Sequence, residues 1–200
     1  MPRDLRICFV GDSYVAGVGD PEHLGWVGRL AAAGARDGLP STSYVLGVRR
    51  QTTAEIADRW AAECRPRLAG GTWESRVVLS TGVNDTTDEG GAPRLAPQES
   101  VEALTRVLTG AAAAGWPLLV VGPAAVADEA QNERIASLDG RFARTCAMHG
   151  VPYVPVHALL AADPTWAAEV AAGDGAHPGA AGYAAMAGLV RPSWRRWITG

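Results

Sequence analysis

Short apolar runs alternate along this chain with longer alanine-rich stretches. The runs are typical of buried strands, and the stretches have the composition of helices. Strands are predicted at Leu5–Val10, Ser43–Leu46, Arg76–Ser80, Pro117–Val121 and Val151–Val154. Helices are predicted at roughly His23–Arg36, Thr53–Leu68, Pro97–Ala114, Gln131–His149 and Gly179–Trp197. This alternation predicts an α/β fold with a mostly parallel sheet.

Residues at the ends of the predicted helices agree with these boundaries. Glycines that suit a left-handed helix end follow several of them, namely Gly38, Gly70-Gly71, Gly115 and Gly150. Thr52 or Thr53 is expected to cap the second helix, with Glu55 in its first turn. The segments Asp85–Ala96 and Gly122–Ala130 are rich in Gly, Pro, Asp and Ala, and we predict that they are loops over the sheet edge.

Length and composition narrow the class of protein. We expect one domain over residues 1–200, because the length fits one and 48% hydrophobic residues supply a substantial core. The formal net charge is −3, with no dense block of basic residues to follow a phosphate backbone. We therefore expect no nucleic-acid partner. Composition says nothing about the oligomeric state.

The cysteines and the N-terminal residues bear on localisation. Cys8, Cys64 and Cys146 are odd in number and widely spaced, so we interpret them as free, buried thiols that suit a reducing cytoplasm. The apolar run that follows Arg6 is too short for a secretory signal or a membrane span. We expect a cytoplasmic protein without a membrane span, although a processed, secreted form would look the same.

A candidate nucleophile follows the first predicted strand. Gly11-Asp12-Ser13 comes directly after it, at the strand end where an open α/β sheet presents helix N-termini and free backbone N–H groups. Near the other end of the chain, Asp174 and His177 stand three residues apart. A hydroxyl, a base and a group that orients the base are the minimum set for acyl transfer. Taken alone, Ser13 could equally be a helix N-cap.

Four blocks that occur in a fixed order favour Ser13 as a nucleophile over Ser13 as a helix N-cap. They are Gly11-Asp12-Ser13-Tyr14, the segment from Leu46-Gly47 to Thr53, Gly82-Val83-Asn84-Asp85, and Asp174-Gly175-Ala176-His177-Pro178. Together they resemble the SGNH (GDSL-type) hydrolase family over the whole chain. Tyr14 stands where the family usually has Leu, and Val45 where Asn is frequent, which leaves the substrate preference open.

The resemblance implies a three-layer α/β/α sandwich with a flavodoxin-like sheet in the order 2-1-3-4-5. In that order, the carboxyl ends of the first three strands form one edge, at which Ser13, Gly47 and Asn84 converge. The backbone N–H groups of Ser13 and Gly47 and the Asn84 amide would then stabilise an oxyanion. Gly47 could instead be a turn glycine, and Asn84 could cap a turn. We expect Asp12 and Asp85 to hold their loops by accepting backbone N–H bonds.

The second half of the candidate site surrounds His177. Pro178 disfavours helical backbone at His177 and suits the first turn of the following helix. A tight turn through Gly175 would bring the Asp174 carboxylate to one ring nitrogen and leave the other facing Ser13. The alternatives are a helix-capping histidine and a turn aspartate. The remaining histidines have no serine block beside them and are weaker candidates: His23, His149 and His157.

Other chemistries lack support in the sequence. The nucleophile elbow of α/β-hydrolases needs a second glycine where this chain has Val15. No His, Asp or Glu cluster has the spacing of metal ligands, so we expect neither a metal nor a cofactor. Trp26 and Trp60 could line an acyl or sugar pocket or pack in the core, and Trp194 and Trp197 could dock the last helix or form a dimer contact.

We therefore interpret the chain as a serine esterase that acts on a small-molecule ester, with Ser13 as nucleophile, His177 as base and Asp174 as orienting group. Short acyl or acetyl groups are favoured, because the length leaves little room for a deep lid. Lysophospholipids, thioesters and acetylated carbohydrates are alternative substrates. The alternative of a different class is a non-catalytic module that binds a glycan or an acyl group at the same edge.

Overall fold

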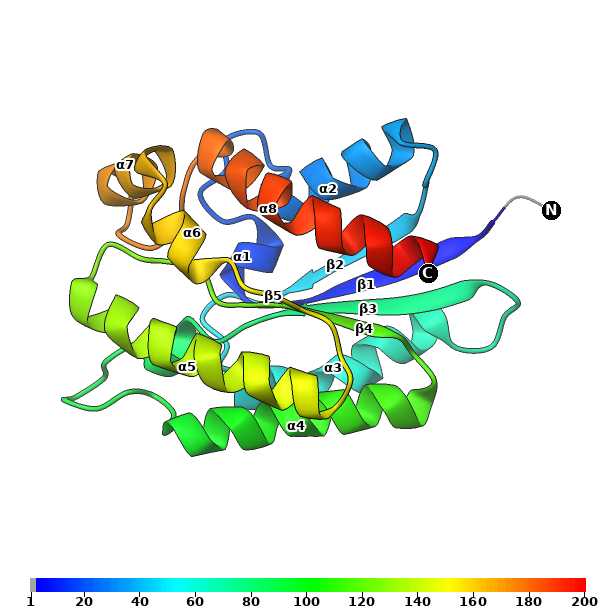
Figure 1. Cartoon of the computed structure of the whole chain (residues 1–200), viewed down its shortest axis with the longest axis horizontal. Helices are drawn as coiled ribbons and strands as arrows, with labels where there is room; N and C mark the ends of the chain where they lie inside the picture. Colours follow the sequence, from blue (N-terminus) through cyan, green and yellow to red (C-terminus); the bar gives the residue numbers. More distant parts are fainter. Residues whose placement is uncertain (1–2) are drawn as a thin grey trace.

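A five-stranded parallel sheet forms the centre of the computed structural model, which describes residues 3–200. The strand order is β2-β1-β3-β4-β5, as predicted (Figure 1). The strands are β1 (Leu5–Gly11), β2 (Thr42–Gly47), β3 (Glu74–Ser80), β4 (Leu118–Val121) and β5 (Tyr153–Val154). Proline cannot donate a ladder hydrogen bond, and Pro152 and Pro155 flank β5, which explains why it is shorter than predicted.

Helices cover both faces of the sheet and give the three predicted layers. The long helices are α2 (Gly25–Arg36), α3 (Thr53–Leu68), α4 (Pro97–Ala114), α5 (Glu129–Met148) and α8 (Ala180–Thr199). In Figure 1, α2 and α8 lie on one face, and α3, α4 and α5 lie on the other. The change of face at β1 arises because the chain moves from β1 outward to β2 and then returns past β1 to β3.

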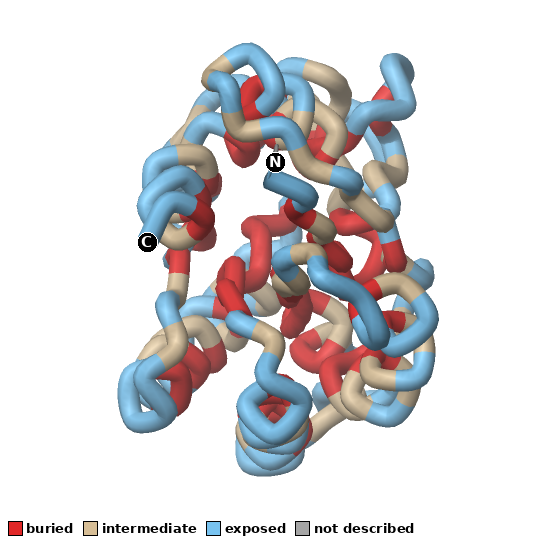
Figure 2. Tube along the Cα trace, turned by 90° about the vertical axis from the view of Figure 1, so that its right-hand side faces the viewer, coloured by how far each residue is buried: buried red, intermediate tan, exposed pale blue. Residues whose placement is uncertain are grey.

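The alternation of side chains along β1 explains why both faces are covered. Ile7 and Phe9 pack into the core under α2 and α8, whereas Cys8 and Val10 pack into the core under α3. Buried segments accordingly lie between the layers (Figure 2). A strand that is apolar on both faces is the expected centre of a doubly covered sheet.

Burial distinguishes between the two interpretations of Trp26, Trp60 and Trp194. Trp26 and Trp60 pack in the two cores, so neither lines an open pocket. Trp194 is fully buried and docks α8 onto α2, where a Cβ added to Gly34 would clash with its ring. Trp197 is half-buried and packs against the core beneath α8.

Several boundary predictions agree with the structure. Thr52 caps α3 and forms a capping box with Glu55. Of the glycines predicted to suit a left-handed helix end, Gly38, Gly70, Gly115 and Gly150 have positive φ, whereas Gly71 does not. The three cysteines are free and buried.

Short helices that the pattern did not reveal complete the chain. They are α1 (Ser13–Ala16), the 3-10 helix η1 (Asn84–Thr86), α6 (His157–Ala161) and α7 (Pro164–Ala172). Elements of this length span too few turns to show an apolar period, so capping residues carry the signal instead. Asp163 and Pro164 are such a signal at the start of α7. Within residues 3–200, no helix is long and apolar enough to cross a lipid bilayer.

Candidate active site

Ser13 lies where β1 ends and α1 begins. The Asp12 side chain caps α1 by accepting a hydrogen bond of 3.0 Å from the Tyr14 N–H, and left-handed Gly17 ends the helix after one turn. Ser13 is 4% exposed and is the first residue of this turn. A backbone N–H in that position has no partner inside the helix, so it is free to bind a ligand oxygen.

The structure brings His177 and Asp174 to Ser13. The His177 Nε2 atom lies 2.7 Å from Ser13 Oγ, and its Nδ1 atom lies 2.7 Å from Asp174 Oδ2. The Asp174 Oδ1 atom accepts hydrogen bonds from the N–H groups of Ala176 and His177 through a turn at left-handed Gly175. The predicted turn is therefore present, and three side chains form one continuous hydrogen-bonded chain.

The ionisation of Asp174 determines which atoms donate and which accept in these hydrogen bonds. Partial burial acts to raise the pKa of Asp174, but hydrogen bonds from the backbone and ring of His177 and from the Ala176 N–H outweigh it and bring the pKa to about 2. An ionised carboxylate accepts hydrogen bonds only, so the His177 proton resides on Nδ1. The Nε2 lone pair then accepts the hydrogen bond from the Ser13 hydroxyl.

Tyr14 joins the Ser13 and His177 segments directly. Its hydroxyl donates a hydrogen bond of 2.7 Å to the Ala176 carbonyl, and its ring centroid lies 5.1 Å from that of His177. The side chain is 2% exposed and also stacks with Trp166. Sequence reasoning treated Tyr14 only as a departure from a family pattern. A buried aromatic ring with a polar tip was the signal that it needs a partner.

A close backbone approach holds the imidazole from another side. A Cβ added to Gly19 would lie 3.0 Å from the His177 Cβ and 2.8 Å from the Pro178 carbonyl oxygen, and Gly19 has φ = +89°. The segment after α1 can therefore pack on His177 only with glycine at this position. The Tyr183 hydroxyl fixes the same segment by donating to the Val18 carbonyl.

Asn84 lies at the same edge of the sheet, in η1 after β3. Its Nδ2 atom donates a hydrogen bond of 3.0 Å to the Gln51 carbonyl and lies 3.3 Å from Asp12 Oδ2. Asp85 accepts a hydrogen bond of 2.7 Å from the Thr53 N–H at the start of α3. Asp12 and Asp85 thus hold their loops as expected. One of the two Asn84 amide hydrogens is directed to the Gln51 carbonyl, and the other makes only the longer contact to Asp12.

Gly47 lies outside the pocket that contains Ser13. Neighbouring residues of a strand direct their N–H groups to opposite sides, and the Val48 N–H donates to Gly11 of β1. The Gly47 N–H therefore points away from β1, toward the free edge of β2. A Cβ at Gly47 would clash with the backbone of Ala16 and Asp12, so this glycine permits α1 to pack on β2. The expectation that its N–H faces Ser13 is not met.

The turn that follows β2 lines the Ser13 pocket, whereas Gly47 does not. Val48–Gln51 is a turn in which Arg50 has φ = +66°, and Arg50 lines the pocket together with Ser13 and Asn84. No hydrogen bond within residues 3–200 uses the Arg50 backbone N–H. Sequence reasoning missed this residue because a left-handed turn position favours glycine. The signal available in the sequence was that Arg50 lies in the short connection between β2 and the capping box of α3, at the same sheet edge as Ser13.

The pocket over these groups has a volume of about 490 Å³. Its walls come from the turn after β2, η1 and the loop after it, the start of α5, and the segment from Asp174 to His177. This volume is in the range of small-molecule sites. In the described part of the chain, no cluster of three or more His, Cys, Asp or Glu residues has a geometry for a metal ion.

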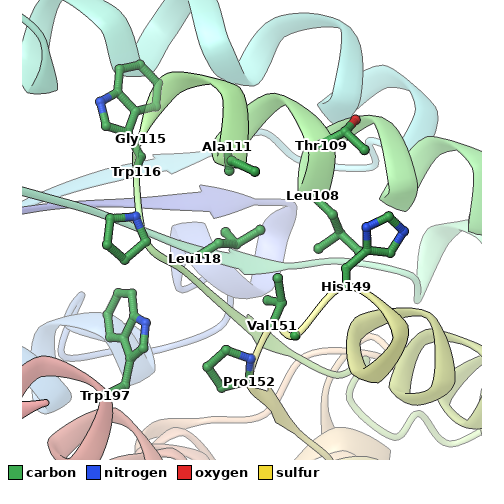
Figure 3. Close-up of a pocket in the computed structure, with 13 residues that line it drawn as sticks. Leu108, Thr109, Ala111, Gly115, Trp116, Leu118, His149, Val151, Pro152 and Trp197 are labelled. Carbon is green, nitrogen blue, oxygen red and sulfur yellow. The ribbon is translucent and has the colours of Figure 1, made fainter.

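A second hollow of about 550 Å³ lies at the opposite end of the strands (Figure 3). Trp116, Trp197 and His149 line it, together with apolar residues of α4, β4 and the segment before β5. Neither serine nor carboxylate is among its lining residues. No hydrogen bond within residues 3–200 joins His23, His149 or His157 to a serine, so the Ser13 pocket is the candidate active site.

A family model matches most of the chain. It is described as the GDSL-like Lipase/Acylhydrolase family and covers residues 9–185. Among curated proteins, the comparison gives no match.

Solved structures share the fold. A lipase/acylhydrolase from Enterococcus faecalis has 20% sequence identity and a TM-score of 0.72, with 94% of each chain covered. The psychrotrophic esterase EstA from Pseudoalteromonas sp. has 16% identity and a TM-score of 0.75, with 98% of this chain and 100% of that chain covered. The acetylxylan esterase Axe2 from Geobacillus stearothermophilus has 15% identity and a TM-score of 0.72, with 99% and 96% covered. At these identities, the structural likeness shows the fold alone.

We expect the hydrogen bond of the Tyr14 hydroxyl to contribute measurably to stability. Tyr14→Phe removes its hydrogen bond and leaves the Ala176 carbonyl without that donor, so the free energy of unfolding should fall by about 1 kcal/mol. Urea denaturation measures the change. Tyr44→Phe is the matched control, because no hydrogen bond within residues 3–200 uses the Tyr44 hydroxyl, and it should leave the free energy nearly unchanged. Equal effects of the two substitutions would contradict the assignment.

Asp12 predicts a pH dependence of stability. Burial is the main cause that raises the pKa of Asp12, to about 7, and the charge of Asp85 adds to it against the hydrogen bond from the Tyr14 N–H. The folded protein therefore keeps a proton that the unfolded chain releases above about pH 4. Asp12 favours the folded state at low pH, and this contribution declines as the pH rises from about 4 to about 7.

Asp12→Asn cannot ionise, so its stability relative to wild type should increase over this pH range and level off above it. Urea denaturation midpoints of both proteins between pH 4 and pH 8 give the comparison. Exposed Glu102→Gln is the control for removal of a carboxylate and should show no such increase. Parallel midpoint curves for wild type and Asp12→Asn would refute the prediction.

Proposed function

The chain belongs to the GDSL-like lipase/acylhydrolase family of carboxylic ester hydrolases, and we propose that it hydrolyses short acyl or acetyl esters through an acyl-enzyme on Ser13. The observation that carries this proposal is the hydrogen-bonded chain from Ser13 through His177 to Asp174, with both contacts to the ring at 2.7 Å. A serine hydroxyl is a weak nucleophile by itself and becomes active when a neighbouring base accepts its proton.

His177 would act as the base and then as the acid. As Ser13 Oγ attacks the ester carbonyl, its proton passes to His177 Nε2, and the imidazolium returns that proton to the departing alcohol. The same ring then takes a proton from the water that attacks the acyl-enzyme, and returns it to Ser13 Oγ as the bond to the acyl group breaks and the acid leaves. Asp174 remains ionised, with its pKa near 2, and so stabilises the imidazolium in both halves of the reaction.

Three donors would bind the negative charge that develops on the carbonyl oxygen. The Ser13 N–H is free at the start of α1, and the second N–H of Asn84 is held only by the 3.3 Å contact to Asp12. We assign the third donor to the Arg50 N–H instead of the Gly47 N–H, because Arg50 lines the pocket and its N–H has no partner within residues 3–200. Donors already fixed in place stabilise an oxyanion without reorganisation.

The size of the pocket favours small acyl groups. A volume of about 490 Å³ at the sheet edge is enough for a short acyl group and part of the alcohol. Two neighbours of the same fold are described as acetyl xylan esterases, which supports acetyl esters as the first substrates to test.

Turnover of p-nitrophenyl acetate tests this mechanism. Ser13→Ala should abolish turnover above background, and Asn84→Ala should lower kcat by roughly 10²–10³-fold through loss of one oxyanion donor. Ser193→Ala, which removes a hydroxyl on α8 outside the pocket, is the control and should retain full activity. In a series from acetate to octanoate, kcat/KM should fall as the acyl chain lengthens. Wild-type turnover by Ser13→Ala would remove Ser13 from the mechanism, and a preference for octanoate would overturn the acyl-length proposal.

A further inference from the structure

One wall of the Ser13 pocket is formed by arginines. Arg49 and Arg50 come from the turn after β2, and Arg94 comes from the loop that follows η1. His177 and Asp174 line the same pocket. A substrate bound at Ser13 therefore lies next to a group of guanidinium ions on one side.

Two of these arginines are engaged with the protein. Arg94 donates a hydrogen bond to the Arg50 carbonyl and lies 3.5 Å from the carboxylates of Glu55 and Glu89. The Arg50 guanidinium lies 3.3 Å from Glu89, so the two arginines share this carboxylate. Arg94 thus stabilises the turn through the Arg50 carbonyl. The guanidinium groups of Arg94 and Arg50 are each paired with a carboxylate.

Arg49 has no such compensation. Its side chain is exposed on the pocket wall, and no ion pair or side-chain hydrogen bond within residues 3–200 involves it. The aspartates that line the pocket are already engaged: Asp174 with His177, and Asp128 as the N-cap of α5. The guanidinium of Arg49 is therefore available to an anionic group of a ligand.

The backbone of the turn is consistent with a use for these side chains. Arg50 is one of two residues other than glycine with positive φ within residues 3–200, and this conformation is unfavourable for a residue that has a side chain. Glycine would relieve that strain. Unfavourable backbone retained beside a reactive serine points to a function for the residues that hold it.

We propose that the esters hydrolysed at Ser13 carry a carboxylate and that Arg49 binds it. The inference rests on the proposed function and specifies its substrate class. Guanidinium binds carboxylate through two parallel hydrogen bonds, which fix the orientation of the ester as well as its position. Arg49 is then a specificity residue, and Arg50 contributes when the substrate carboxylate competes with Glu89 for its guanidinium.

Two matched pairs of esters test the proposal. Phenyl acetate and 3-acetoxybenzoate differ by a carboxylate on the leaving group, and 4-nitrophenyl hexanoate and mono-4-nitrophenyl adipate differ by a carboxylate at the end of the acyl chain. Wild type should show the higher kcat/KM for the anionic member of at least one pair. Arg49→Gln should lower that value by roughly tenfold more than it lowers the value for the neutral partner.

The control separates local binding from overall charge. Arg36→Gln removes the same charge from the end of α2, far from the pocket, and should affect both members of each pair alike. Added salt should reduce the wild-type preference, because exposed charges are screened. The proposal fails if wild type prefers neither carboxylate ester, or if Arg49→Gln lowers both members of each pair by the same factor. Absence of wild-type turnover of every ester would instead overturn the proposed function, and this inference with it.

Discussion

The hydrogen bonds that hold the His177 imidazole between Ser13 and Asp174 are the interaction on which the rest of the site depends. The Ser13–His177 contact joins residues 164 positions apart in the chain. It forms only because the segment before α8 returns to the end of β1. Two tyrosine hydroxyls secure that return, Tyr14 through the Ala176 carbonyl and Tyr183 through the Val18 carbonyl. The imidazole is thus positioned by buried packing and hydrogen bonds on both sides.

The topology of the sheet supplies the other groups. Gly11 at the end of β1 lies opposite Gly47 of β2 and Ser80 of β3, so the segments that follow these three strands emerge side by side. Asp12 connects them: it caps α1 and lies within 3.3 Å of the Asn84 amide. Burial raises its pKa to about 7, because a charged carboxylate is unfavourable away from water.

Much of the fold and most residues of the candidate site could be predicted from the sequence. The apolar runs and the ordered blocks led to the strand order, and the run Asp174–Pro178 contains both the turn and the histidine that it presents. Gly47 shows the limit of this reasoning, because the direction of a backbone N–H depends on strand parity, which changes with each residue. Arg50 was hidden because its left-handed backbone is atypical for its residue type. Tyr14 required a partner, Ala176, that only the folded chain identifies.

The most direct test of the account is covalent labelling of the folded protein with a fluorophosphonate, followed by mass spectrometry of its peptides. This reagent requires a serine activated by a neighbouring base. We predict one adduct per chain, located on Ser13, absent in Ser13→Ala and formed much more slowly in His177→Ala. An adduct on another residue, or no adduct on folded wild-type protein, would contradict the claim that His177 activates Ser13.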